Sequence, residues 1–349
     1  MATDMLEQMV SEGVKKKPER RSTRLISPRK LRETYPRSSS SESVVLGSRK
    51  IVENILEGID KRLLIIIGPC SINDPEAALD YARKLKRLSD EIHENGDNVY
   101  LIMRTYFEKP RTTVGWKGLV SNPEGLVEAR KLLRRITELE VPCATEFLNP
   151  YVFRYIQDHI TWSAIGARNN KSQPHREFGS DLEMPVGIKN SDEGGIVGSR
   201  NSIIAAGTSQ DYFGIDDEGY VAFIENTLGN LYAHLILRGS ENGPNYDRES
   251  VAKALRILEG VRKKIVIDGS HDQTLDPETG EKDYMKQEDV AFDIVDQRVE
   301  GNEDIVAFMC ESYLVGGSGN KYGQSKTDKC LGWEDSERLV RGINKKLNL

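Results

Sequence analysis

The sequence predicts an α/β protein built as a (β/α)8 TIM barrel, with an N-terminal extension and an inserted β-hairpin. From about residue 50 onward, eight short apolar runs alternate with amphipathic stretches, which is typical of repeated βα units. The first run ends in Gly68-Pro69-Cys70-Ser71, not in the glycine-rich turn that usually follows the first strand of a doubly wound sheet. The 349 residues are enough for a barrel of about 250 residues with additions.

Residues 1–45 are predicted to form a polar, basic arm, followed by a barrel domain over residues 46–349. Between Lys15 and Lys30 the only acid is Glu19. The basic residues of this stretch are Lys15, Lys16, Lys17, Arg20, Arg21, Arg24, Arg29 and Lys30. Such a composition favours a solvated, partly disordered chain. The apolar pair in Leu25-Ile26-Ser27-Pro28 favours an arm that contacts a neighbouring subunit, and nucleic-acid binding is the less favoured alternative.

The apolar runs give the eight predicted strands. They cover residues 62–70, 99–107, 141–147, 161–168, 185–190, 231–240, 264–271 and 305–312. Helical patterns cover residues 74–95, 123–139, 247–262, 286–299 and 333–347. Asp74 followed by Pro75 is a clear helix start, because aspartate caps free N–H groups and proline fits the first turn. The stretch 210–226 is too long for a loop and is predicted to be the inserted hairpin.

Composition excludes several classes of function. A net charge of −6 argues against general nucleic-acid binding. No stretch approaches the roughly 18 apolar residues that span a bilayer, and the N-terminus has no apolar signal core. Four widely spaced cysteines do not form a disulfide framework. We therefore expect a cytoplasmic protein that binds neither membranes nor nucleic acid.

The residues at the predicted strand ends indicate an anion-binding site. In a parallel barrel the carboxyl ends of the strands carry the chemistry. The residues at these ends are Cys70, Arg104, Glu146, Arg168, Lys189, Arg238, His271 and Glu311. Four cations at one barrel mouth would repel each other unless an anion neutralised them, and arginine suits phosphate and carboxylate. We expect a small phosphorylated acid as ligand, with Lys109, Arg111 and Thr112 of the following loop as a second phosphate site.

A second group of strand-end residues indicates a metal site. Cys70, His271 and Glu311 end the first, seventh and eighth strands, which are neighbours in a closed barrel, and Asp328 follows shortly after. A thiolate, an imidazole and two carboxylates suit a divalent transition metal such as Mn, Fe, Co or Zn. The alternative interpretation is a buried thiol, a capping histidine and two solvated acids.

Taken together, these motifs resemble the type I 3-deoxy-D-arabino-heptulosonate 7-phosphate (DAHP) synthases. The resemblance extends from about residue 45 to the C-terminus. It rests on Gly68-Pro69-Cys70-Ser71-Ile72, Lys109-Pro110-Arg111-Thr112, Gly115-Trp116-Lys117-Gly118, Gly166-Ala167-Arg168, Lys189-Asn190, Leu237-Arg238-Gly239, Ile267-Asp268 with Ser270-His271, Glu311-Ser312 and Gly332-Trp333-Glu334-Asp335.

The resemblance implies a transferase that condenses phosphoenolpyruvate with erythrose 4-phosphate, the first step of the shikimate pathway to the aromatic amino acids. It implies one divalent metal ion, with Mn²⁺ preferred over Fe²⁺, Co²⁺ or Zn²⁺, and a homodimer or homotetramer. The implied metal ligands are Cys70, His271, Glu311 and Asp328. The implied phosphoenolpyruvate ligands are Arg104, Lys109, Ala167, Arg168, Lys189 and Arg238. Arg111 and Thr112 would bind the aldose phosphate. The implied catalytic residues are Lys109, as proton donor, with Cys70 and His271.

The sequence departs from the family pattern near two of these residues. Asn169-Asn170-Lys171 follows Arg168, and Gly269 and Asp272-Gln273 flank His271. No implied metal or phosphoenolpyruvate ligand is lost, so the departures concern the aldehyde. One alternative is therefore the same condensation on a different phosphosugar in a secondary-metabolic pathway. The other is a non-catalytic regulatory barrel. No feedback effector is predicted.

Overall fold

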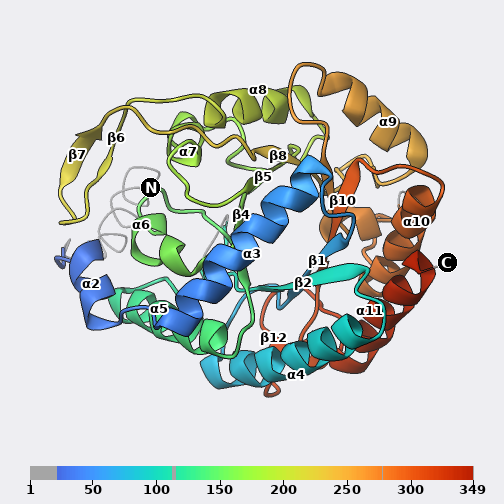
Figure 1. The fold of residues 1–349 in the computed structure, drawn as a ribbon, viewed down its shortest axis with the longest axis horizontal. Helices are drawn as coiled ribbons and strands as arrows, with labels where there is room; N and C mark the ends of the chain where they lie inside the picture. The colour runs from blue at the N-terminus through green and yellow to red at the C-terminus, as the bar shows by residue number, and fades with distance from the viewer. Residues whose placement is uncertain (1–21, 112–114, 277, 349) are drawn as a thin grey trace, which may run out of the picture.

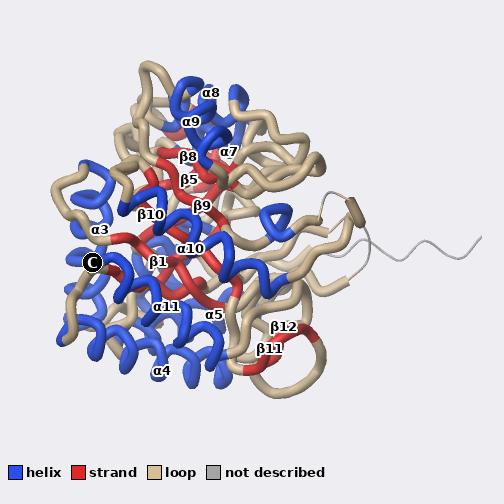
Figure 2. Tube along the Cα trace, turned by 90° about the vertical axis from the view of Figure 1, so that its right-hand side faces the viewer, coloured by secondary structure: helices blue, strands red, loops and turns tan. Residues whose placement is uncertain are grey.

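The computed structural model describes residues 22–111, 115–276 and 278–348, and it confirms the predicted (β/α)8 barrel. Eight parallel strands close in the order β1-β10-β9-β8-β5-β4-β3-β2 (Figures 1 and 2). The strands are β1 (Leu63–Gly68), β2 (Val99–Arg104), β3 (Cys143–Glu146), β4 (Trp162–Ile165), β5 (Val186–Lys189), β8 (His234–Leu237), β9 (Ile265–Asp268) and β10 (Ile305–Glu311). Closure pairs β1 with β10 and sets Gly68 opposite Glu311, so the first and last strands end side by side.

A helix follows each barrel strand. These helices are α4 (Pro75–Glu94), α5 (Pro123–Glu138), α6 (Phe153–Ile156), α7 (Gln173–Gly179), α8 (Val197–Ala206), α9 (Arg248–Ile257), α10 (Gln287–Val299) and α11 (Trp333–Leu347). Short 3₁₀ turns add η1 (Gln157–His159), η2 (His271–Thr274) and η3 (Tyr284–Lys286). The start of α4 confirms the predicted cap, since the Asp74 side chain accepts hydrogen bonds from the backbone N–H groups of Glu76 and Ala77.

The strands alternate between two apolar layers, as their twofold periodicity requires. In β1, Leu63 and Ile65 belong to the layer under the outer helices, whereas Leu64 and Ile66 belong to the barrel interior. The interior layer continues into helix α3 (Ser39–Glu57), which crosses the barrel in Figure 1 and contributes Val52, Ile55 and Leu56. Helix α3 spans residue 45, the predicted boundary between arm and barrel, and its apolar residues close the amino-terminal end of the barrel.

The structure confirms the inserted hairpin. Strands β6 (Tyr212–Ile215) and β7 (Val221–Ile224) pair antiparallel between α8 and β8, and β5 pairs directly with β8. Helix α2 (Pro28–Thr34) lies beside the hairpin, where Arg29 pairs with Glu218 at 2.6 Å and Arg32 with Asp217 at 2.7 Å. The described part of the basic arm is thus tied by ion pairs to an insertion in the same chain.

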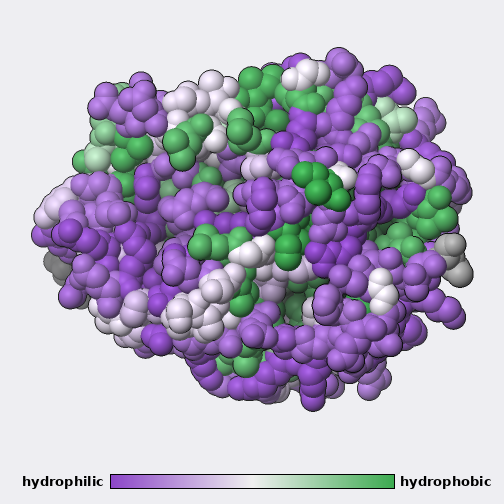
Figure 3. Space-filling model, in the orientation of Figure 1, coloured by the Kyte–Doolittle hydropathy of each residue, from purple (hydrophilic) through white to green (hydrophobic). Residues whose placement is uncertain are grey.

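Beyond β10, a small parallel sheet joins β11 (Val315–Ser318) to β12 (Gln324–Ser325) and leads to the loop that carries Asp328. The face shown in Figure 3 is mainly hydrophilic, with scattered apolar areas. Within the described residues, no helix combines the length and the apolar character needed to cross a membrane.

Candidate active site

The carboxyl ends of the strands surround a cavity of about 500 Å³. The predicted site residues that line it are Arg104, Lys109, Arg111, Ala167, Arg168, Lys189, Arg238, His271, Glu311 and Asp328. Cys70 lies directly beside this lining, because its Sγ is 2.9 Å from Lys109 Nζ. Thr112 lies outside the described residues. The fold therefore collects side chains from strands far apart in the sequence at one end of the barrel.

Three predicted metal ligands form a compact group. The Cys70 sulfur and one carboxylate oxygen each of Glu311 and Asp328 lie within 4.8 Å of one another. The Cys70 thiol donates a hydrogen bond to Asp328 Oδ2 at 3.1 Å, and burial together with the charge of Glu311 raises its pKa to about 12. Such a thiol keeps its proton until a cation takes the proton's place. One thiolate and two carboxylates make a donor set that fits a divalent transition metal.

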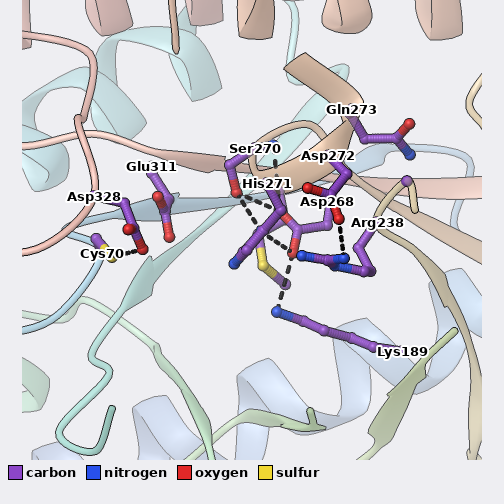
Figure 4. Close-up of polar contacts among 12 residues, drawn as sticks. Cys70, Lys189, Arg238, Asp268, Ser270, His271, Asp272, Gln273, Glu311 and Asp328 are labelled. Carbon is purple, nitrogen blue, oxygen red and sulfur yellow. Dashed lines mark hydrogen bonds and ion pairs between the residues drawn. The ribbon is translucent and has the colours of Figure 1, made fainter. Parts of the chain in front are cut away.

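The fourth predicted ligand, His271, lies at the same cavity but not within this compact group. Its Nδ1 is 3.1 Å from Asp268 Oδ2 and 2.8 Å from Ser270 Oγ. Nδ1 is therefore occupied within the protein, and Nε2 is the nitrogen left for a ligand. His271 also has a φ of +57°, in the left-handed region that residues other than glycine seldom adopt. Figure 4 shows its ring between Asp268 and the side of the site that holds Glu311 and Asp328.

The floor of the cavity holds two buried cations. Arg104 is fully buried and pairs with Glu311 at 3.1 Å, and its guanidinium lies 4.0 Å from the ring centre of Tyr106. Lys189 Nζ is 3.1 Å from both Glu146 Oε2 and Asp268 Oδ2. Burial alone would lower the pKa of Lys189, but the two carboxylates outweigh burial and raise the pKa, so the ammonium stays charged. These cations can therefore bind an anion at neutral pH.

The outer part of the cavity holds the other two predicted strand-end cations. Arg238 is nearly buried and pairs with Asp272, and its Nη1 is also 3.3 Å from Asp192 Oδ1. Arg168 Nε is 3.6 Å from the second oxygen of Asp192, and most of the Arg168 side chain is exposed. The predicted anion-binding residues of strands β2, β4, β5 and β8 thus lie in one cavity, from a buried floor to an open rim.

The aldose-phosphate loop is described only in part. Arg111 lines the cavity, and its Nε donates a hydrogen bond to the carbonyl oxygen of Trp116 at 2.9 Å. Preceding it, Glu108 accepts hydrogen bonds from the backbone N–H groups of Leu148 and Asn149, each at 3.2 Å. Burial raises the pKa of Glu108 to about 7. Glu108 ties the Lys109 loop to the segment that follows β3.

Sequence reasoning missed most of the acids that hold these cations in place. Asp268 was part of the motif Ile267-Asp268 but received no role; in the structure it ends β9, three residues before His271. Glu146 was recognised at a strand end but received no role. Asp192 lies in a loop, where nothing in the local pattern distinguishes it from a solvated charge, and the same holds for the cation Lys282.

A closed parallel barrel with cations and a thiol–carboxylate group at its strand ends defines a (β/α)8-barrel enzyme that acts on small anionic substrates. The chain belongs to the DAHP synthetase I family, whose sequence model matches residues 37–341.

The named relatives are enzymes of one kind. The chain is 42% identical over 343 residues to the Tyr-sensitive phospho-2-dehydro-3-deoxyheptonate aldolase of Escherichia coli K12, covering 93% of each chain. It is also 42% identical over 337 residues to the Trp-sensitive enzyme of Shigella flexneri, covering 91% of this chain and 94% of that one. The solved structure of phospho-2-dehydro-3-deoxyheptonate aldolase from Francisella tularensis SCHU S4 superposes with a TM-score of 0.88 at 36% identity, covering 95% of this chain and 99% of that one. The family and these relatives confirm the resemblance and the enzyme class inferred from the sequence.

Proposed function

We propose that the chain condenses phosphoenolpyruvate with erythrose 4-phosphate, giving 3-deoxy-D-arabino-heptulosonate 7-phosphate and inorganic phosphate. Family membership supports this reaction. One structural observation supports the proposal that this chain performs it. Every predicted substrate-binding residue that the structure describes lines the same cavity. A cavity of about 500 Å³ is large enough for two small phosphorylated substrates.

We propose that Cys70, Glu311 and Asp328 hold one divalent metal ion, with His271 as the fourth ligand. The compact group of sulfur and carboxylate oxygens supports this assignment, and Mn²⁺ is the first candidate, with Fe²⁺, Co²⁺ and Zn²⁺ as the others. When bound, such an ion would supply Lewis-acid polarisation of the aldehyde oxygen.

Lys109 is the proposed proton donor. Burial alone would lower the pKa of Lys109, but the neighbouring Cys70, Glu311 and Asp328 outweigh burial and raise it, so Lys109 holds a proton. As C3 of phosphoenolpyruvate bonds to the aldehyde carbon, the aldehyde oxygen becomes an alkoxide and takes the proton from Lys109.

The cations of the cavity neutralise the negative charges of phosphoenolpyruvate. They bind its carboxylate and phosphoryl groups and hold C3 toward the aldehyde. After the carbon–carbon bond forms, the oxygen of a water molecule adds to C2, and the C2–O bond to phosphate breaks as the C2 ketone forms. Of the two protons that the water loses, one restores the ammonium of Lys109 and the other leaves with the phosphate. The fixed positive charges of Arg168 and Arg238, in the outer part of the cavity, stabilise the phosphate that leaves.

An aldehyde panel tests the proposal. The protein, supplied with Mn²⁺ and phosphoenolpyruvate, is given erythrose 4-phosphate, arabinose 5-phosphate or ribose 5-phosphate, and phosphate release is measured. We expect the highest kcat/KM with erythrose 4-phosphate. Efficient turnover of another aldose with poor turnover of erythrose 4-phosphate would establish the alternative phosphosugar reaction. A protein without bound metal and without turnover would instead be the non-catalytic barrel.

We also propose that the chain assembles as a homodimer or homotetramer. The hairpin supports this proposal, because Phe213, Val221 and Phe223 expose a large part of their apolar side chains on one small sheet. Light scattering coupled to size-exclusion chromatography measures the mass, and a mass of about 39 kDa at every concentration would contradict the proposal.

A further inference from the structure

Lys282 reaches the cavity from the segment that follows η2. Leu275 and Lys282 form an antiparallel bridge, and the Asp283 N–H donates a hydrogen bond to the Thr274 carbonyl oxygen at 3.2 Å. These contacts hold the backbone at Lys282 beside Thr274 and Leu275. Its side chain is half exposed and lines the cavity. Neither the predicted anion site nor the proposed mechanism uses it.

One carboxylate holds Lys282 beside Arg238. Lys282 Nζ is 2.5 Å from Asp272 Oδ1, and Arg238 Nη1 pairs with the other oxygen, Oδ2. Figure 4 shows the side chains of Arg238 and Asp272 pointing toward each other. Asp272 is buried, and a Cβ at Gly239 would lie 2.4 Å from the Asp272 carbonyl carbon, so the end of β8 lies directly against η2. Asp272 is therefore a fixed anchor shared by two cations.

The pairing continues to Arg168 through Asp192. Lys282, Asp272, Arg238, Asp192 and Arg168 form a row of alternating charges along the outer part of the cavity. The two carboxylates let three cations lie close together without net repulsion. An ammonium has three donors and a guanidinium five, so each cation retains N–H groups for a ligand after pairing.

We propose that Lys282 is a further substrate-binding residue, which holds the phosphoryl group of phosphoenolpyruvate together with Arg168 and Arg238, and that Asp272 is its positioning residue. The inference rests on the proposed function. Lys189 and Arg104 are buried on the floor, whereas Lys282 and Arg168 are exposed at the rim. The phosphate leaves in the reaction, so its binding groups belong where the cavity opens to solvent.

Equilibrium binding of phosphoenolpyruvate, measured by calorimetry on the Mn²⁺-loaded protein without aldehyde, tests the role of Lys282. We expect Lys282→Ala to raise the Kd and the KM for phosphoenolpyruvate about tenfold or more, with kcat changed less than about threefold. Competitive inhibition by inorganic phosphate should weaken by a similar factor. Lys282→Arg should restore most of the affinity, because it restores the positive charge.

Lys286 provides a matched control, because it belongs to the same segment but pairs with Asp276 and does not line the cavity. Lys286→Ala should bind phosphoenolpyruvate as the wild type does. Asp272→Asn should also weaken the binding of phosphoenolpyruvate. In the Asp272→Asn background, Lys282→Ala should raise the Kd by a smaller factor than it does in the wild type, because the two residues act together.

Two outcomes separate the inference from the proposed function. A wild type that binds phosphoenolpyruvate, with Lys282→Ala equal to it in Kd and in phosphate inhibition, would overturn the role of Lys282 alone. A wild type that neither binds nor consumes phosphoenolpyruvate would overturn the proposed function and, with it, this inference.

Discussion

The two ends of the barrel differ in the side chains that line them: one end is apolar and the other is charged. The amino-terminal end is closed by helix α3, whose Val52, Ile55 and Leu56 pack on the apolar interior of the strands. The carboxyl-terminal end opens into a cavity lined by cations and carboxylates, many of them buried in pairs. Apolar burial stabilises a fold, whereas buried charge costs free energy unless it is paired. The contrast indicates that one end carries stability and the other carries function.

Substitution of Cys70 should give the largest effect and should act on function alone. Cys70→Ser is expected to lower metal content and to reduce kcat/KM by about 1,000-fold, because a Lewis acid contributes several kcal/mol. The measurement is metal analysis of the purified variant followed by the turnover assay. A variant with wild-type metal content and activity would remove Cys70 from the metal site, and a large loss of thermal stability would break the division between the two ends.

Truncation of Ile55 should lower stability and leave activity unchanged. Ile55 is 2% exposed within α3, and Ile55→Ala is expected to lower the free energy of unfolding by about 2–5 kcal/mol through loss of apolar burial. Activity at 25 °C should not change. Leu46→Ala is the control, because Leu46 lies on the same helix but is half exposed, and it should cost less than about 0.5 kcal/mol. Loss of activity in folded Ile55→Ala protein would show that α3 influences the cavity.

Glu108 should show that a buried carboxyl beside the cavity lowers the free energy of unfolding when it ionises. Its pKa is about 7 in the folded protein and near 4.5 when the chain is unfolded, so ionisation favours the unfolded chain. As pH rises from about 4.5 to above 7, wild-type stability should therefore fall relative to Glu108→Gln, by about 3 kcal/mol at about 1.4 kcal/mol per pKa unit. Urea unfolding of both proteins at pH 5, 6, 7 and 8 measures the difference. A difference that does not vary with pH would mean that Glu108 is ionised throughout.

Asp268 should give the smallest of these effects. It is fully buried between His271 and Lys189, and Asp268→Asn is expected to reduce metal affinity or kcat/KM about 10- to 100-fold by loosening both partners. Asp304→Asn is the control, because Asp304 pairs with Lys264 at the opposite end of the barrel. Mn²⁺ titration and steady-state kinetics give the two readouts. Equal behaviour of the two variants would show that Asp268 does not position the site.

Local patterns were enough to predict the barrel strands, the inserted hairpin and the helices α4, α5, α9, α10 and α11. Each barrel strand lies within a short apolar run, and some helix starts carry a recognisable side-chain cap, such as Asp74-Pro75 or Asn122-Pro123. These signals do not depend on distant residues, so the barrel and its inserted hairpin were both predicted. The strand ends followed from the barrel, because parallel strands all finish at the same end.

The partners of each charged residue could not be predicted in the same way. Asp192 and Lys282 lie in loops and Asp272 lies in η2, and these segments come together with β8 only after the barrel closes. The position of His271 outside the compact group of Cys70, Glu311 and Asp328 also depends on the turn that follows β9, where φ of His271 is positive. Loop conformation is set by many long-range contacts, which leave no periodic signal in the sequence.

The sequence by itself determined the architecture, the identity of the strand-end residues and the positive character of the site. Apolar periodicity and helix caps depend on only a few neighbouring residues, so they can be recognised from the sequence alone. Only the tertiary structure decided which carboxylate holds which cation, because such pairs form between segments tens to hundreds of residues apart. Within each pair the opposite charge keeps both groups ionised against the cost of burial, and these pairs exist only once the chain has folded.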